Sequence, residues 1–182
     1  MQIAFTAFAD DSIFTGNLAL EADRLSDVVA ADDGFRIQDV EITALDTGRT
    51  LTAASAEITR GDFAAMTANG PRGNPARRFP TRQHPIRTEI GPYQVVGYLH
   101  APRSAHVLAG AVRRRVVPIT SATIRYRLGA SEIRRSFDVL LLNGDRLVWV
   151  EPASRAEMTA GAPFEAPGRL GRPGDMRGNV SH

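Results

Sequence analysis

The sequence contains no cysteine, which excludes disulfides, thiol catalysis and thiolate metal sites. Lysine is absent as well, so all 22 basic residues are arginines. An alanine-, arginine- and glycine-rich chain without lysine is typical of a GC-rich genome, so the arginines alone do not indicate anion binding. No apolar run approaches the roughly 20 residues that a membrane-spanning helix needs, and no signal-peptide pattern occurs. We therefore expect a soluble cytoplasmic protein without membrane contacts.

Sequence motifs of enzymes are also missing. None of the four histidines has the spacing of a metal site, and no GxSxG frame nominates a nucleophile. The acidic pairs Asp10-Asp11 and Asp32-Asp33 fall in predicted loops, where such pairs are usually solvated turn residues. We expect a non-catalytic protein with no metal and no cofactor. One enzymatic alternative stays open, in which Asp32, Asp33 and His106 converge in a pocket.

One pattern occurs twice along the chain. A block that begins at Gly16 returns 81 residues later at Gly97, and each block continues with a short predicted helix, a bent strand and a final strand pair. The predicted helices begin at cap residues Asp23 and Ser104. The final pairs are joined at Gly61-Asp62 and at Asn143-Gly144-Asp145, and Asn-Gly is a strong hairpin signal. The repeat predicts two small β-domains.

The bend in the third element of each block is the most specific structural signal. The apolar positions in 35–44 change from odd to even numbers between Ile37 and Val40, and the same change follows Ile119 in the second block. Such a change of phase indicates a β-bulge, the device by which a small sheet curls into a barrel.

The ends of both blocks, ITRGDFAAMTA and LLLNGDRLVWVEP, resemble the last strand pair of Sm-like domains. This resemblance covers about a dozen residues per block. It implies a small five-stranded barrel, ring-like association and single-stranded RNA held at the loops. Because HAPRSAHVL stands where that family has an Asp-x-x-Met-Asn motif, only Asn143, Gly144 and Asp145 carry over as turn residues. We expect a mainly β fold of two tandem, diverged SH3-like or Sm-like barrels, each with one short helix.

Charge divides the chain in the same way as the repeat. Residues 1–69 form the acidic first repeat, with four arginines against twelve Asp or Glu, a net of −8. Residues 70–85 form a predicted linker rich in proline, glycine and arginine, 86–152 form the basic second repeat, and 153–182 form a flexible tail. An acidic repeat joined to a basic one favours packing of the two, or head-to-tail contact between chains.

The function that we expect from these features is protein interaction or scaffolding, through a protein partner or self-association. The alternative is binding of RNA or another single-stranded nucleic acid by the basic repeat. That alternative would use a set of seven arginines, with Tyr126 or Trp149 available for stacking: Arg113, Arg114, Arg115, Arg125, Arg127, Arg134 and Arg135. Arg125 and Arg127 are predicted to share an outer face, whereas Tyr126 points to the opposite side, away from any base on that face.

Overall fold

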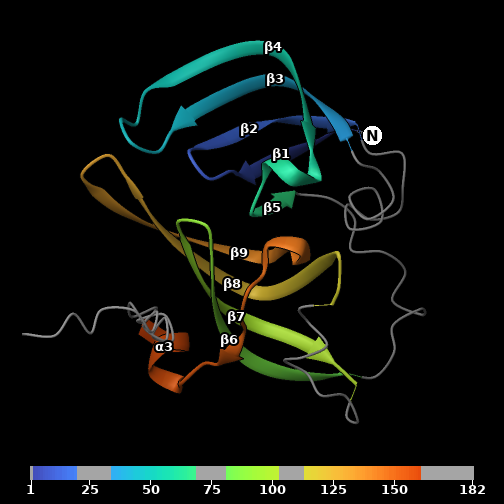
Figure 1. Ribbon diagram of the computed structural model, residues 1–182, viewed down its shortest axis with the longest axis vertical. Coiled ribbons are helices and arrows are strands. Elements are labelled where there is room, and N and C mark those ends of the chain that lie inside the picture. The colour runs from blue at the N-terminus through green and yellow to red at the C-terminus, as the bar shows by residue number, and fades with distance from the viewer. Residues whose placement is uncertain (1, 20–33, 69–80, 103–112, 161–182) are drawn as a thin grey trace, which may run out of the picture.

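A computed structural model of the protein describes residues 2–19, 34–68, 81–102 and 113–160. These residues form one open antiparallel sheet of ten strands, in the order β10-β6-β7-β8-β9-β5-β1-β2-β3-β4 (Figure 1). The predicted mainly β architecture is therefore confirmed. Among the residues placed, no helix is long and apolar enough to cross a membrane.

The elements of the first half are five strands and one 3-10 helix: β1 (Gln2–Phe8), β2 (Ser12–Ala19), β3 (Gly34–Ala44), β4 (Thr50–Thr59), η1 (Arg60–Asp62) and β5 (Ala65–Ala68). The second half contains the same succession followed by a short helix: β6 (Arg82–Ile90), β7 (Tyr93–Ala101), β8 (Val116–Leu128), β9 (Ser131–Asn143), η3 (Gly144–Arg146), β10 (Glu151–Pro152) and α3 (Arg155–Ala160).

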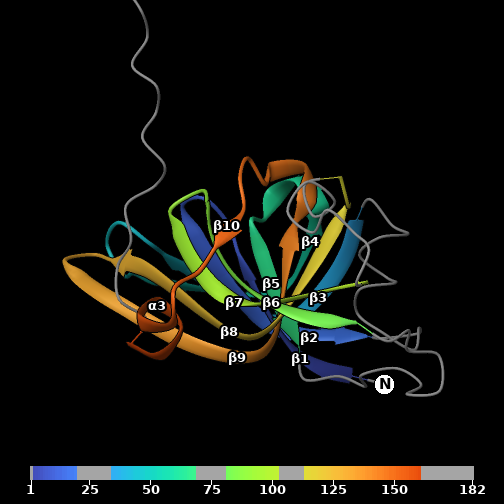
Figure 2. The same cartoon turned by 90° about the horizontal axis from the view of Figure 1, so that it is seen from below.

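Both halves connect their strands in one way. The fifth strand of each half pairs with its first strand, β5 with β1 and β10 with β6, and the other strands follow in chain order. The halves become one sheet because β5 also pairs with β9. Figure 2 shows the strands fanning out along the sheet, as the usual twist of β-sheets requires.

The predicted bends in β3 and β8 are confirmed. Asp39 and Ser121 have positive φ angles of 51° and 47°, and the pairing register with the preceding strand shifts beside each of them. Because of this bulge, Ile37 and Val40 both face the core although their numbers differ in parity.

The repeated glycines stand opposite these bulges. A Cβ atom on Gly16 would lie 2.6 Å from the carbonyl oxygen of Gln38, and one on Gly97 would lie 2.4 Å from Cγ2 of Ile119. No real Cβ contact is that short, so only glycine fits where the second strand crosses the bulge.

The closing strand pairs differ from the prediction. Neither β4 and β5 nor β9 and β10 pair with each other, and only Glu151–Pro152 of the predicted strand RLVWVEP is a strand. In both halves a 3-10 helix turns the chain away from the fourth strand, and the next large side chain, Phe63 or Leu147, is buried. This anchoring leads the fifth strand to the first strand instead of back along the fourth.

The predicted linker and tail are partly ordered. Strand β6 begins at Arg82, so the last four residues of the predicted linker 70–85 belong to the sheet. In the predicted flexible tail 153–182, residues Arg155–Ala160 form the helix α3. Both predicted helices after Asp23 and Ser104, and the trio Asp32, Asp33 and His106, lie outside the described residues.

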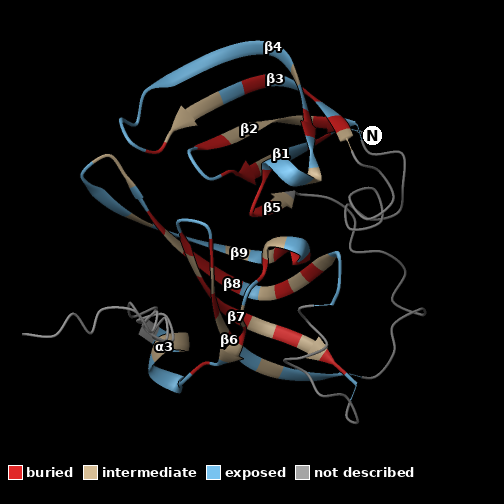
Figure 3. Ribbon diagram, in the orientation of Figure 1, coloured by how far each residue is buried: buried red, intermediate tan, exposed pale blue. Residues whose placement is uncertain are grey.

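The two halves share their apolar cores. The Phe8 ring of β1 packs edge-to-face among Tyr93, Tyr126 and Phe137 of the second half, with centroid distances of 5.5, 6.0 and 5.9 Å. In return, Leu141 of β9 belongs to the core of the first half. Figure 3 shows the buried segments concentrated toward the middle of the sheet, whereas β4 is exposed along most of its length.

Candidate functional site

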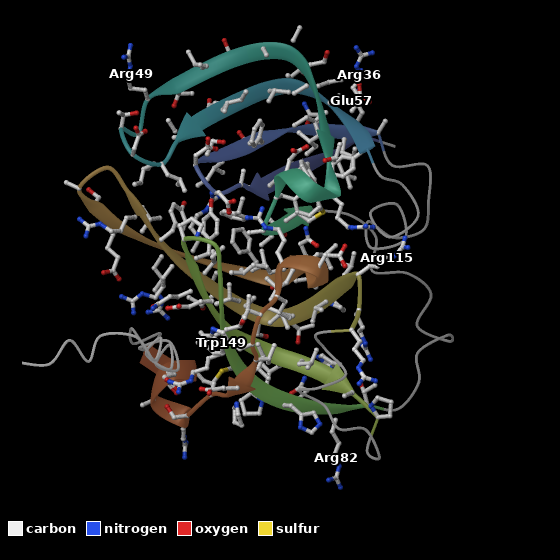
Figure 4. The ribbon with its side chains drawn as sticks, in the orientation of Figure 1. Arg36, Arg49, Glu57, Arg82, Arg115 and Trp149 are labelled. Atoms are coloured by element: carbon white, nitrogen blue, oxygen red, sulfur yellow. The ribbon has the colours of Figure 1, made fainter. Side chains whose placement is uncertain are left out.

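The seven predicted contact arginines do not form one site. Arg113, Arg114 and Arg115 are exposed and lie just before β8, whereas Arg125 and Arg127 lie near its other end. Ten residues of strand separate Arg115 from Arg125, which corresponds to roughly 30 Å. Figure 4 shows Arg115 near the boundary of the two halves, away from the tip of the β8–β9 hairpin.

Three of the arginines share the outer face of the β8–β9 hairpin. Arg125 lies directly opposite Arg134, and Arg127 lies opposite Glu132. The guanidinium group of Arg125 forms an ion pair with Glu132. Arg135 lies on the other face, opposite Ile124, with its guanidinium 5.4 Å from the centre of the Phe137 ring.

The aromatic side chains near this basic face are committed to the core. Tyr126 is 6% exposed and Tyr93 is fully buried, which confirms that Tyr126 points away from Arg125 and Arg127. Burial raises the pKa of the Tyr93 hydroxyl above its usual range, and the neutral hydroxyl donates a hydrogen bond to the carbonyl of Ala9 in the first half. Tyr93 therefore links the halves and offers no ring surface for a base.

An open depression adjoins the same hairpin. Its lining includes the turn between β6 and β7 and charged side chains of both signs. The lining residues are Glu89, Gly91, Pro92, Tyr93, Gln94, Arg125, Tyr126, Arg127 and Glu132. The amide of Gln94 donates to the Glu89 carboxylate over 2.8 Å. With charges of both signs in its lining and two of its pairs bonded to one another, this depression does not single out a ligand.

The predicted Sm-like turn is a structural joint between the halves. Asn143 is 2% exposed, and its side-chain nitrogen donates to the carbonyl oxygens of Arg60 at 2.7 Å and Phe63 at 3.0 Å. Asp145 forms an ion pair with Arg60 over 3.2 Å. A Cβ atom on Gly144 would lie 1.5 Å from the carbonyl oxygen of Arg114, so this turn packs directly on the chain before β8.

Metal and acid–base chemistry receive no support from the residues placed. Within the described ranges, no three His, Cys, Asp or Glu side chains come together in a way that could hold a metal ion. His100 accepts or donates hydrogen bonds with two threonines, Thr120 at 2.8 Å and Thr81 at 3.3 Å. The bond to Thr120 joins the neighbouring strands β7 and β8, and Thr81 directly precedes β6.

The two ends of the sheet carry its exposed apolar side chains. Strand β4 ends the sheet in the first half, and its residues 50–56 contain neither a charge nor a proline. The large apolar residues that are exposed among those described are Leu51, on β4, at 71% and Val148, just before β10, at 83%. Natural edge strands are usually protected by charges, prolines or bulges, so an uncharged edge of this length is a candidate contact surface.

An ion-pair network fixes the other end of the sheet. Arg87 of β6 bonds to Glu151 of β10 at 2.9 Å and to Glu157 of α3 at 2.6 Å. These carboxylates raise the pKa of Arg87. Ser154 and Glu157 also form a reciprocal capping box, in which each backbone amide bonds to the other side chain. The backbone amide and hydroxyl of Ser154, with Arg87, lower the pKa of Glu157.

The structure thus brings together Arg125, Arg127 and Arg134, separates them from Arg113–Arg115, and turns Asn143 inward. The edge surfaces at β4 and Val148 were not identified from the sequence, because solvent exposure of an edge depends on the strand order.

The chain matches no protein-family model, no curated protein and no solved structure.

Proposed function

We propose that the chain is a duplication of one SH3-like or Sm-like β-unit, fused into a single sheet. Ile119 follows Ile37 by 82 residues, and each is buried just before the residue with positive φ. Their partners on the fourth strands, Ala56 and Leu140, are 84 residues apart, and so are the starts of the two 3-10 helices. The nearly equal offsets of 82 and 84 residues support common ancestry of the halves.

We propose further that the protein is a non-catalytic scaffold that associates with itself. The observation that carries this proposal is the open sheet: within the part of the chain that the structure describes, its two ends, β4 and β10, have no strand partner on their outer sides. The outer side of such an edge presents backbone N–H and C=O groups that a second strand can satisfy. Strand addition of this kind is a common mode of protein recognition.

Charge supports contact between unlike ends. The first 69 residues carry a net charge of −8, and because the whole chain carries +2, the remaining residues carry +10. The free edge β4 lies in the acidic half and β10 lies in the basic half. Head-to-tail contact therefore places opposite charges together, whereas contact of two like halves places equal charges together.

The test is the mass of the purified protein in solution. Light scattering coupled to size exclusion should give a mass that rises above that of one chain as protein concentration increases, and added salt should reduce it. A monomer mass at every concentration and salt condition would rule out the scaffold proposal.

Nucleic-acid binding is a second candidate, favoured by one observation. Arg125 and Arg134 lie directly opposite each other with Arg127 on the same face, and like charges in directly opposed positions cost stability. An anionic ligand would add to the charge compensation that Glu132 already gives Arg125. If so, fluorescent RNA should bind at low salt, weaken steeply as salt rises, and bind poorly to a variant with Arg125, Arg127 and Arg134 changed to Gln. Absence of binding at low salt would eliminate this candidate.

A further inference from the structure

We infer that association occurs by a defined joint, in which residues 148–150 of one copy add to the β4 end of the next copy. The joint repeats the contact that already joins β5 to β9 inside each chain. This inference rests on the proposed self-association and names the surfaces that would carry it.

The internal joint provides the geometry. Ala65 and Met66 of β5 lie opposite Leu142 and Leu141 of β9. Just beyond this pair, the backbone amide of Asn143 donates to the carbonyl of Ala64 over 2.9 Å. The joint therefore places the start of one fifth strand along the end of another half's fourth strand.

Each partner in this joint has a counterpart 84 residues away at a free end of the sheet. On the fourth strand, Ile58 corresponds to Leu142, because the core residues Phe35 and Val117 lie opposite them on the third strands. On the fifth strand, Trp149 corresponds to Ala65. Applying the internal register to two copies places Trp149 opposite Ile58 and Val148 opposite Thr59.

The residue that precedes the fifth strand is buried in the internal joint and exposed at the free end of the sheet, as expected if a second copy covers it there. Ala64 is fully buried in the internal joint, whereas its counterpart Val148 is 83% exposed. Addition to the β4 end of a second copy would cover Val148 in the same way. Figure 4 shows Glu57, beside Ile58 on β4, and Trp149 in different halves of one molecule, so the contact requires a second copy.

The backbone amide of Thr59 gives an independent sign of an open position. Its counterpart Asn143 donates this amide to a carbonyl of the neighbouring half, but Thr59 donates to the side chain of Asp62 at 2.7 Å. The Asp62 carboxylate thus occupies the place of a strand carbonyl. The carbonyl of Val148 from a second copy would replace it.

Because the chain contains no cysteine, single introduced cysteines can test this register. We would mix a Thr59→Cys protein with a differently tagged Val148→Cys protein under mild oxidation and separate the products on a denaturing, non-reducing gel. The predicted product is the mixed disulfide dimer, which only contact between two copies can form. A mixture of Leu51→Cys with Val148→Cys is the matched control, because Leu51 is as accessible but lies at the other end of β4, and it should give little mixed dimer.

Two results would overturn the inference. One is equal cross-linking in the Leu51 control, and the other is an associated protein whose Thr59 and Val148 cysteines do not join. Both results leave self-association intact, whereas a wild-type monomer removes the proposed function as well. As a measurement that needs no cross-link, Val148→Glu should weaken association more than about tenfold by burying an unpaired charge. Ala130→Glu, in the exposed turn between β8 and β9, should leave association nearly unchanged.

Discussion

At the scale of residues, the bulges in β3 and β8 determine which side chains form the core. A single residue with positive φ moves the buried set from odd to even positions, and the glycine facing it admits the close approach of the neighbouring strand. The sequence displays both signals, and they are therefore the part of the fold that could be predicted most specifically.

Gly97→Ala should test this role. The added methyl group would meet Cγ2 of Ile119 at 2.4 Å and Cα of Ala122 at 3.1 Å, and overpacking of this kind costs about 2 kcal/mol. Urea denaturation followed by circular dichroism would measure the loss. Gly34→Ala is the matched control, because its nearest neighbour would lie at 3.6 Å. Equal stability of the two variants would contradict the tight crossing.

Asn143 illustrates a residue whose role the sequence did not reveal. Its Asn-Gly sequence predicts a hairpin turn, yet the side chain is buried and donates hydrogen bonds to two backbone carbonyls of the other half. The difference arises because local sequence reports turn propensity and cannot report the residues that a distant half brings to the turn.

Asn143→Ala should lower the free energy of unfolding by about 2 kcal/mol, because two buried carbonyl oxygens lose their donor. The comparison variant is Asn17→Ala, whose half-buried side chain makes a hydrogen bond to Asp39 at 3.1 Å. Thermal unfolding of both variants would decide the matter. If Asn143→Ala were no more harmful than Asn17→Ala, the joint described here would not hold the halves together.

At the scale of elements, the strands with clear alternation were predictable and their partners were not. The sequence located the bent strands and the turns near Gly61 and Gly144. It did not indicate that β5 and β10 pair with first strands, since pairing depends on where Phe63 and Leu147 anchor the chain. The hairpin from β6 to β7 was also missed, because its first residues read as a proline-rich linker. Gly91, with φ of 57°, forms its turn.

The attachment of α3 and β10 should depend on pH through Glu157. The pKa of this carboxyl is lower in the folded protein than its ordinary value of 4.5. Its contribution to stability is therefore complete above that pH and is lost as pH falls through the lower folded value. Hydrogen exchange of residues 151–160 should increase over this acidic range.

Glu157→Gln should loosen the same segment at neutral pH and remove the acidic transition. Glu132→Gln is a suitable control, since Glu132 pairs with Arg125 on a different hairpin. An acidic transition that persists unchanged in Glu157→Gln would assign the pH dependence to another group.

At the scale of the whole molecule, the β5–β9 pairing joins the two halves, and the corresponding strands at the two ends of the sheet lack this pairing within the described residues. Interlocked cores and the β5–β9 pairing make one continuous sheet. It ends in the acidic half at β4, whose residues 50–56 are uncharged, and in the basic half at the short strand β10. The charge division was readable from sequence. The open edges were not readable from sequence, because they follow from the strand order. The seven arginines that the sequence nominated lie on separate surfaces of the structure.

Hydrogen exchange of the β4 backbone at increasing protein concentration would show whether a second copy covers the end of β4. Peptides covering Glu57–Arg60 should exchange faster in dilute protein and become protected as the protein associates. The end of β9 at Leu141–Asn143 should be protected throughout, because it already bonds to β5 and Ala64. Exchange of the β4 end that is independent of concentration, in a sample whose mass rises, would rule out strand addition at β4.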